Sequence, residues 1–477
     1  MSQTQAPERR RQFISFSLLA LLFLILVLLY GRPVIQNDGI SYYGLAVSLV
    51  EDGDFDLKNQ YETHPEIRIV KKRFENKVAS LYSCGFAYLY APFLYVADQF
   101  QVLRELRVYS QNVVFPFSHG LSILLGSLFY GFLSVAVAGL LLVKTETVSP
   151  VHAMLFSSAA FIGTPLLFYS MSTPSFAHAA DTFLVTISFC LAVTQSTFPI
   201  GPVRFRNVLL GFFLAFTVML RNNNAVIVPV VVAGLLYFDR KEGWKRALMT
   251  SLEVLAGAIP VILVHASFNL SQYGRLFATG YGVSVKSEVA TRRITQFWWI
   301  LFHPVAGLYP WSPVAILSTI GLVLGIRRKS RTCALALTVV AVVIFSIRFA
   351  AIIFPGGTFG QRLLTHLYIF WVLGLVEFVR RFKKTGIVLA ALCVAWSFLL
   401  FNSYFTITGS EQSRILTKEG GSSPVVWFQT ANQLCSDAIQ RQETTGCISF
   451  WYTSLGNNPY PVLLHTIMRD RPAKNVE

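Results

Sequence analysis

The sequence predicts an all-α polytopic membrane protein, and three observations support that prediction. Hydrophobic residues make up 54% of the 477 residues and charged residues only 13%, about half the roughly 25% charged residues of a soluble domain. Apolar runs of about 15 to 25 residues recur along the chain, the length that crosses a hydrocarbon core of roughly 30 Å. Lys and Arg exceed Asp and Glu by 40 to 24, a net charge of +16. In a membrane protein such an excess reports orientation, so it does not indicate nucleic acid binding.

The first apolar run is predicted to be a retained transmembrane helix that enters from the cytoplasm. Three arginines at positions 9 to 11 precede an apolar run from Phe13 to Tyr30. This run is longer than the apolar part of a typical signal peptide, and the residues after it offer no small-x-small cleavage site.

A long polar stretch follows, from Arg32 to about Asn112, and it is expected to form a first outer loop at about 31 to 114. Helices lying along the membrane surface are expected within it, because the segment from Leu81 to Val96 is aromatic and contains Gly and Pro. Ten further spans are predicted at about 115 to 143, 151 to 169, 178 to 197, 206 to 220, 225 to 238, 247 to 268, 307 to 326, 332 to 352, 363 to 379 and 385 to 403.

The total is about 11 transmembrane helices, with a range of about 10 to 13. The lower count merges residues 206 to 220 and 225 to 238 into one re-entrant element. The higher counts add a span near residue 90.

Loop charge predicts the orientation of these spans, because Lys and Arg in short loops collect on the cytoplasmic side. With the N-terminus inside, the outer turns carry few basic residues, among them Arg221 and Arg362. An odd number of spans places residues 404 to 477 outside, as a small C-terminal segment beside a transmembrane domain of residues 1 to 403. The inner loops carry Lys144, Arg204, Arg206, Arg240, Lys241, Lys245, Arg246, Arg327, Arg328, Lys329, Arg331, Arg380, Arg381, Lys383 and Lys384.

Two of the six cysteines, Cys435 and Cys447, lie in this predicted outer segment. They are predicted to form a disulfide, because the compartment outside the cytoplasm is oxidising. No cysteine spacing resembles a zinc or haem site.

The first candidate for chemistry is Asp38, which lies eight residues beyond the first helix with Tyr42 and Tyr43 close behind it. A carboxylate held at the membrane surface beside two tyrosines is suited to act as a general base. The alternative is an Asn-Asp-Gly turn that caps a surface helix starting at Ser41.

An acidic turn follows at Glu51 to Asp56, where Asp52 and Asp54 form an Asp-x-Asp triplet. Such oxygen clusters can hold a hard divalent cation, and nucleotide-sugar enzymes use them in this way. The turn is predicted to lie outside, however, where a solvated acidic turn is the favoured interpretation and a metal site the weaker alternative.

His178 and Asp181 lie at the outer end of the fourth predicted span. Their spacing of three residues places them on one helical face, and ionisable residues in a span are functional candidates. The alternative is a cap at the start of a helix.

Three arginines are predicted at the outer side, Arg221, Arg348 and Arg362. Arg348 lies inside an apolar run, where a guanidinium is costly unless it reaches water or faces an anion. The three side chains together would suit a phosphate, because the planar fork of arginine matches its geometry.

His303 precedes the segment Gly307-Leu-Tyr-Pro-Trp-Ser-Pro and follows an aromatic stretch at 297 to 299. Trp and Tyr concentrate at the level of lipid headgroups. The segment is therefore predicted to form an interfacial belt, with His303 as a further candidate for binding substrate.

Several of these segments together resemble the integral-membrane glycosyltransferases of the GT-C superfamily. They are Asp38 after a first span, Tyr42 and Tyr43, "EDGDFDL", "SFNLSQYGRLFATGY", "HPVAGLYPWSPV" and "GGTFGQRLL". The similarity is greatest to the bacterial branch related to protein O-mannosyltransferases and lipid A aminoarabinose transferases, and it covers roughly residues 10 to 405.

The resemblance implies an enzyme of the bacterial inner membrane that transfers a sugar, with inversion, from a polyprenyl-phosphate carrier to a hydroxyl at the outer face. The acceptor would be a glycan, a lipid or a protein. The family's general base maps onto Asp38, a second acidic position maps onto His178 and Asp181, and Arg362 maps near the lipid phosphate. The chain departs from the family at Gly39, where protein-mannosylating members carry Glu, and in its short C-terminal segment.

The resemblance requires no nucleotide, and no cofactor is implied. Partners are the lipid-linked donor, the acceptor and membrane lipids. The competing hypothesis is a transporter or flippase of lipid-linked sugars, for which inverted repeats and a site at the midplane are expected. The sequence favours the enzyme, because no repeat is found and the ionisable candidates lie towards the outer face.

Overall fold

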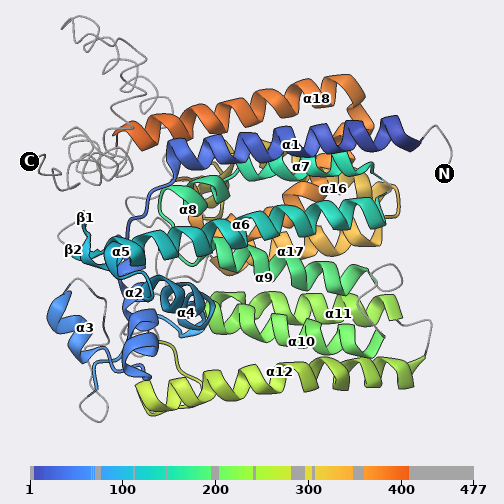
Figure 1. The fold of residues 1–477 in the computed structure, drawn as a ribbon. Coiled ribbons are helices and arrows are strands. Elements are labelled where there is room, and N and C mark those ends of the chain that lie inside the picture. Colours follow the sequence, from blue (N-terminus) through green and yellow to red (C-terminus); the bar gives the residue numbers. More distant parts are fainter. Residues whose placement is uncertain are drawn as a thin grey trace, which may run out of the picture.

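The fold is a bundle of long helices with smaller elements gathered at one end (Figure 1). The computed structural model describes residues 5–65, 67, 69, 77–110, 113–146, 148–194, 203–239, 243–280, 296–302, 307–347 and 359–407. The bundle contains α1 (Gln5–Tyr30), α6 (Phe117–Thr145), α7 (Pro150–Ile162), α9 (His178–Val193), α10 (Val203–Leu220), α11 (Ile227–Asp239), α12 (Trp244–Tyr273), α16 (Val314–Arg327), α17 (Arg331–Ile347) and α18 (Tyr368–Ile407).

The elements of the predicted first outer loop lie together at one end of the bundle, here called the hairpin end (Figure 1). Its strands β1 (Arg107–Ser110) and β2 (Val113–Pro116) pair antiparallel, with Val108 opposite Phe115. The all-α prediction missed these strands, which contain short runs of β-branched and aromatic residues. The other elements of this loop are α2 (Asp38–Val47), the π-helix η1 (Ser48–Asp52), α3 (Lys58–Thr63), α4 (Gly85–Asp98) and α5 (Gln101–Glu105).

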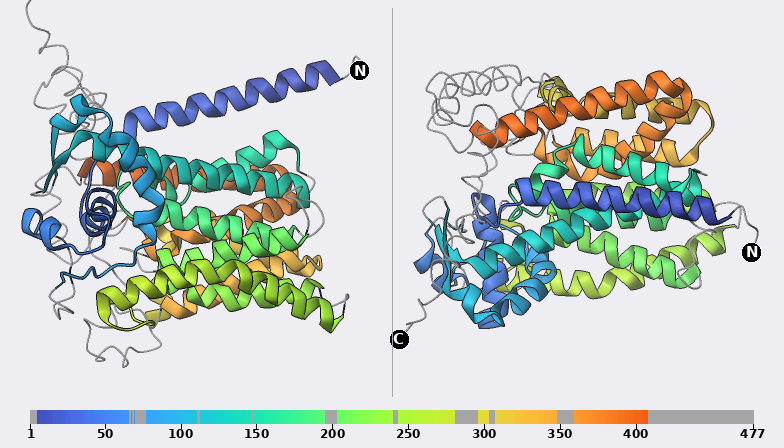
Figure 2. Two further views of the ribbon diagram at one scale, coloured as in Figure 1. Left: turned by 60° about the horizontal axis from the view of Figure 1, so that its bottom comes forward. Right: turned by 45° about the horizontal axis from the view of Figure 1, so that its top comes forward.

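Every predicted span overlaps a helix, and four helical segments are long and apolar enough to cross a membrane. The predicted count of about 11 spans is not decided by this criterion and stays a prediction. Residues 206 to 220 and 225 to 238 belong to separate helices, and α4, near residue 90, lies at the hairpin end (Figures 1 and 2). The four segments are Phe117–Thr145, Val203–Leu220, Trp244–Tyr273 and Arg362–Asn402.

One predicted span is broken, and two others are joined in one long helix. The span at 151 to 169 is divided between α7 and the short α8 (Leu166–Met171), because Gly163 and Pro165 interrupt the helix. The last two spans form the two limbs of α18, which meet at Lys383 with φ 49° and ψ −125°. Three short elements also connect the bundle helices: η2 (Asn222–Val226), α15 (Leu308–Trp311) and η5 (Arg362–Leu367). A further short helix is α14 (Gln296–Phe302).

Glycines allow neighbouring bundle helices to approach closely. A Cβ on Gly257 of α12 would overlap the Val208 carbonyl oxygen of α10, and a Cβ on Gly211 of α10 would overlap the Val254 carbonyl oxygen of α12. Small residues at crossings are typical of membrane helices, where association depends on close packing. This crossing fixes α10, whose C-terminal end leads to Arg221.

Gly257→Leu is expected to separate α10 from α12 and to abolish recovery of monodisperse protein after detergent extraction. The reason is that the new side chain would meet backbone, which cannot rotate away. Size-exclusion chromatography measures the effect, with Ala256→Leu as the control because Ala256 is exposed on the same helix. Equal recovery of both variants would show that the helices are not held at this crossing.

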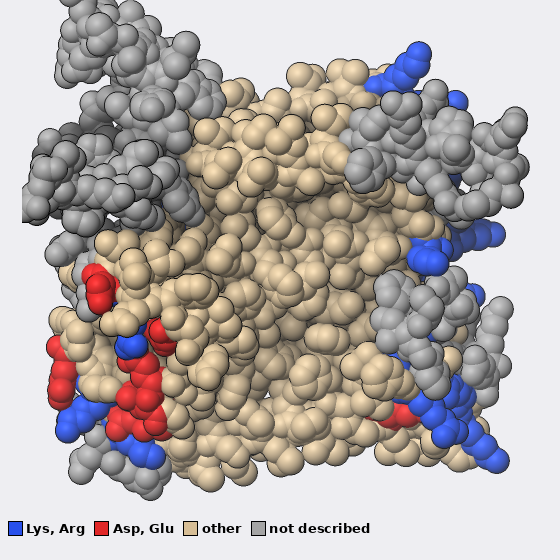
Figure 3. All heavy atoms as spheres, viewed as in Figure 1, with Lys and Arg blue, Asp and Glu red and all other residues tan. Residues whose placement is uncertain are grey.

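Charged side chains lie mainly at the two ends of the bundle, with a broad uncharged surface between them (Figure 3). Asp and Glu gather at the hairpin end, and Lys and Arg are prominent at the opposite end, where the chain begins (Figures 1 and 3). The predicted orientation, in which the hairpin end faces outward, stays a prediction.

The orientation can be tested with single cysteines at two exposed lysines, Lys58 in α3 and Lys144 near the end of α6. A membrane-impermeant maleimide applied to intact spheroplasts is expected to label Lys58→Cys and to leave Lys144→Cys unlabelled. The chain without either replacement gives the background, and detergent should expose both sites. Labelling of Lys144→Cys in intact spheroplasts would reverse the assigned orientation.

Two sequence predictions concern residues that lie outside the described part of the chain. These are the outer segment at 404 to 477, of which only residues up to 407 are described, and the disulfide between Cys435 and Cys447. The division at residue 403 therefore stays a prediction.

Candidate active site

Asp38 is the first residue of α2, at the hairpin end. The helix begins three residues earlier than the Ser41 start that the capping interpretation predicts, and its N-cap, Asn37, makes no side-chain capping bond. Asn37 has φ 53°, a positive value that Asn tolerates better than most residues. A Cβ on Gly39 would overlap Ser175, so α2 packs against the segment before α9 without space for a side chain. Asp38 is thereby held in a buried position.

Asp38 forms an ion pair with Arg362, the first residue of η5. Arg362 Nη2 lies 2.9 Å from Asp38 Oδ2, and the two side chains are 14% and 9% exposed. The Arg362 guanidinium also lies 5.5 Å from the centroid of the Phe176 ring. Two residues separated widely in sequence are therefore joined in a largely desolvated pair, in which a charge interaction is strong.

Asp181 forms a second centre on the first turn of α9. Arg221 Nη1 donates to Asp181 Oδ2 at 3.0 Å and contacts His178 Nδ1 at 3.1 Å. Asn224 Nδ2 donates to Asp181 Oδ1 at 2.5 Å. The predicted placement of His178 and Asp181 on one helical face is consistent with their shared contact to Arg221, and Asp181 is fully buried.

Helix η5 connects the two centres. Its first residue, Arg362, contacts Asp38, and His366 Nδ1 lies 3.6 Å from Asp181 Oδ2. The pairs Asp38–Arg362 and Asp181–Arg221 are here called the double ion pair. It brings together two carboxylates and two guanidiniums at the hairpin end of the bundle. An anion that enters between these pairs would find arginines already oriented by carboxylates.

His366 and Asn224 are contacts of Asp181 that the sequence analysis missed. His366 lies four residues after Arg362 in the "GGTFGQRLLTH" segment, so its spacing was an available signal. Asn224 lies in the Arg-Asn-Asn-Asn turn, where the sequence does not distinguish it from its neighbours.

Tyr42 and Tyr43 lie on α2 with Asp38 but make contacts in different directions. The Tyr42 ring lies 4.5 Å from that of Tyr82 and 5.2 Å from that of Phe86, centroid to centroid, within an aromatic cluster. The Tyr43 hydroxyl lies 2.7 Å from His119 Nδ1. Both tyrosines therefore contribute to packing. Their role in binding substrate stays a prediction.

The acidic turn is held by hydrogen bonds to its own neighbours. Asp52 Oδ2 accepts from Gln60 Nε2 at 2.6 Å and from Asn59 Nδ2 at 3.0 Å. Asp54 Oδ1 accepts from the Asp56 backbone N–H at 2.9 Å. Both aspartates are exposed. Asp52 is thus joined to α3 and Asp54 to the backbone of the turn, and the weaker metal alternative at Asp52 and Asp54 stays a prediction.

His303 and Arg348 lie outside the described residues, so their proposed roles remain predictions. The double ion pair therefore contains two of the three predicted outer arginines, Arg221 and Arg362.

Cys84, directly before α4, is excluded as a nucleophile at neutral pH. Burial raises the pKa of its thiol to about 12, because the thiolate would lose its solvation. The thiol therefore stays protonated and unreactive.

Comparison with known proteins adds two solved structures. The crystal structure of ArnT from Cupriavidus metallidurans in the apo state is similar to this chain with a TM-score of 0.48 and 11% identity, over 88% of this chain and 74% of that one. The crystal structure of the same protein bound to undecaprenyl phosphate gives a TM-score of 0.45 and 13% identity, over 87% and 74%. No family model and no curated protein matches the sequence. Both TM-scores lie below 0.5, so the function is argued from the residues of the site.

Proposed function

We propose that this protein is a membrane glycosyltransferase of the GT-C type, which transfers a sugar from a polyprenyl-phosphate donor to an acceptor hydroxyl. The observation that carries the proposal is the double ion pair. A lipid-linked donor keeps its chain among apolar helices and its phosphate and sugar at the interface. Buried arginines at the end of an apolar bundle suit that phosphate, and a carboxylate beside them suits the attacking hydroxyl.

The proposed reaction uses Asp38 as the general base. The acceptor oxygen attacks the anomeric carbon, its proton passes to the Asp38 carboxylate, and the bond from the anomeric carbon to the phosphate oxygen breaks. The lipid phosphate leaves with the bonding electrons, and inversion follows from attack on the opposite face of the sugar. Positive charge close to the leaving phosphate stabilises the negative charge that develops on it.

The ion pair between Asp38 and Arg362 implies an order of events, in which the donor binds before the base acts on the acceptor. In the structure, Arg362 neutralises Asp38 across 2.9 Å. A donor phosphate that attracts the Arg362 guanidinium would weaken this pair and free the Asp38 carboxylate oxygens to contact the acceptor hydroxyl. The carboxylate would therefore be available to the acceptor only when the donor is present.

The direct test is to incubate purified protein with a panel of polyprenyl-phosphate sugars and candidate acceptors, and to identify the products by mass spectrometry. A glycosylated acceptor together with free polyprenyl phosphate supports the proposal. Asp52→Asn serves as the matched control, because it removes an exposed carboxylate from the same end of the bundle. Translocation of intact donor in liposomes, with no new glycosidic bond, would favour the transporter hypothesis instead.

Two variants of Arg362 distinguish a role in donor binding from a role in folding. Arg362→Gln is expected to lower transfer by about 10² or more, the scale found when a group that stabilises transition-state charge is lost. Arg362→Lys retains the charge opposite Asp38 but loses the planar fork, so it should fold well and still use the donor poorly. Initial rates at several donor concentrations, beside gel filtration, measure both effects.

The control is Arg328→Gln, which removes an arginine that is 57% exposed and lies near the end of α16. Wild-type donor use by Arg362→Lys would remove Arg362 from the donor site. Aggregation of both Arg362 variants would show that the arginine serves the fold.

A further inference from the structure

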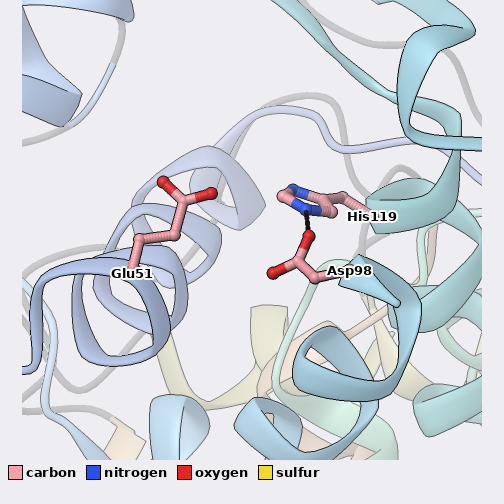
Figure 4. A group of neighbouring side chains, drawn as sticks. All are labelled: Glu51, Asp98 and His119. Carbon is pink, nitrogen blue, oxygen red and sulfur yellow. Dashed lines mark hydrogen bonds and ion pairs between the residues drawn. The ribbon is translucent and has the colours of Figure 1, made fainter. Parts of the chain in front are cut away.

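A second polar cluster lies at the hairpin end, formed by Glu51, Asp98 and His119. Glu51 belongs to η1, Asp98 is the last residue of α4, and His119 lies in the first turn of α6. One ligand atom from each side chain lies within 4.8 Å of the others. Figure 4 shows the three side chains directed toward one another from separate helical segments. None of them contributes to the double ion pair, so the cluster requires its own explanation.

His119 is already oriented as a metal-binding histidine would be. Its Nε2 lies 2.7 Å from Asp98 Oδ1 and its Nδ1 lies 2.7 Å from the Tyr43 hydroxyl, and the side chain is 3% exposed. Histidines that bind metals commonly use one ring nitrogen as the ligand while a hydrogen bond to the other fixes the ring. Tyr43 supplies that second bond, and Nε2 faces Asp98.

Among the residues that the structure describes, Arg104 is the arginine that pairs with the carboxylates of this cluster. Arg104 Nη2 lies 3.5 Å from Glu51 Oε1, and Arg104 Nε lies 3.9 Å from Asp98 Oδ1. The Arg104 side chain is 50% exposed, so its pairing with two carboxylates is weak and easily exchanged for water. A divalent cation would neutralise both carboxylates, and Arg104 could move outward as it enters.

We propose that Glu51, Asp98 and His119 bind a zinc ion. Zinc takes imidazole nitrogen and carboxylate oxygen at about 2.0 to 2.2 Å, which separates tetrahedral ligand atoms by about 3.4 Å. Small side-chain movements therefore suffice, with His119 and Asp98 moving apart and Glu51 moving in. The nitrogen ligand favours zinc over magnesium, which prefers oxygen ligands. Three protein ligands leave a fourth position for water.

The proposed ion would connect η1, the end of α4 and the start of α6. These segments adjoin α2, because η1 follows α2 directly in the chain and the Tyr43 hydroxyl of α2 contacts His119 of α6. Bound zinc would thus stabilise the part of the chain that carries Asp38 without contacting the double ion pair. The sequence showed no zinc motif because the three ligands lie far apart, at positions 51, 98 and 119.

The test measures zinc bound by the full-length, tag-free protein after equilibration with zinc and removal of excess, using elemental analysis and titration calorimetry. We expect one zinc per chain and a higher unfolding temperature with zinc, because a ligand that binds only the folded state stabilises it. Glu51→Gln should lose this zinc, and it is informative because Glu51 is exposed and its loss should not prevent folding. Tyr43→Phe should weaken binding by about 10- to 100-fold, as expected when a supporting hydrogen bond is removed.

Two further variants make the assignment specific. Arg104→Gln should bind zinc more tightly, because the competing cation is gone. Asp52→Asn should bind as the unaltered protein does. Zinc binding that Glu51→Gln leaves unchanged, or that Asp52→Asn abolishes, would place the ion elsewhere and overturn the proposal. If the unaltered protein binds no zinc, the proposal is also overturned. The cluster would then be an ion-pair network that includes Arg104.

Discussion

Asp38→Asn is expected to lower sugar transfer by about 10² or more, the scale of general base catalysis, while donor binding survives. The substitution preserves size and an oxygen that can accept from Arg362, but it removes the proton acceptor. Donor binding can be followed by equilibrium dialysis with a labelled polyprenyl-phosphate sugar, and transfer can be followed by mass spectrometry. The expected signature is therefore donor affinity at least equal to that of the unaltered protein, because Asn competes less than Asp for Arg362, together with greatly reduced turnover.

The structure makes this substitution decisive between two interpretations of Asp38. If Asp38 acted only as a polar residue at a helix start, Asn would serve about as well and the variant would be nearly silent. The N-cap is Asn37, and no side-chain capping bond is present at this helix start. Wild-type transfer by Asp38→Asn would exclude Asp38 as the base and make Asp181 the next candidate. A transporter would form no glycosidic bond with either residue at position 38.

Asp181→Ala is expected to destabilise the protein by about 3 to 5 kcal/mol, the range found when one partner of a buried ion pair is removed. Asp181 is 0% exposed, and Arg221, at 14%, would lose its carboxylate partner. Asn224 would also lose the acceptor that it reaches at 2.5 Å. Thermal unfolding of the detergent-solubilised protein measures the effect as a lower midpoint temperature and a lower yield.

Two matched variants show whether the destabilisation by Asp181→Ala comes from loss of the charge. Asp181→Asn retains an oxygen for Asn224 and loses only the charge, so its destabilisation should be smaller. Asp54→Ala removes an exposed carboxylate at the same end of the bundle and should have little effect on unfolding. An unfolding midpoint of Asp181→Ala equal to that of Asp54→Ala would show that the buried pair contributes nothing to stability. Asp181 would then be a candidate for chemistry alone.

The two predictions assign a catalytic role to Asp38 and a structural role to Asp181. Asp38 retains 9% side-chain exposure and pairs with Arg362, whereas fully buried Asp181 contacts Arg221, Asn224 and His366. Its contacts to Arg221 and His366 suit Asp181 to holding Arg221 and η5 together. The less enclosed Asp38 is the better candidate for contact with an incoming hydroxyl.

The helices of the bundle could be predicted from the sequence because hydropathy and length are local properties. Every predicted span overlaps a helix, and the breaks at Gly163 and Lys383 are details of spans that were otherwise located. The hairpin between Arg107 and Pro116 was missed because its strands are only four residues each. Helix α2 starts three residues before Ser41, the start that the capping alternative predicts, and a local capping pattern contains no sign of the packing of Gly39 against Ser175.

The sequence by itself determined the class of protein, the orientation predicted from loop charge and the candidate residues Asp38, Asp181, Arg221 and Arg362. These follow from composition, run length and the cost of placing charge in lipid, which each segment carries independently. Only the tertiary structure decided which charges meet: Asp38 with Arg362, Asp181 with Arg221 and His366, and Glu51 with Asp98 and His119. Such partners come from segments far apart in the chain. Their meeting depends on how closely and in what register the helices pack, which glycines such as Gly211 and Gly257 permit.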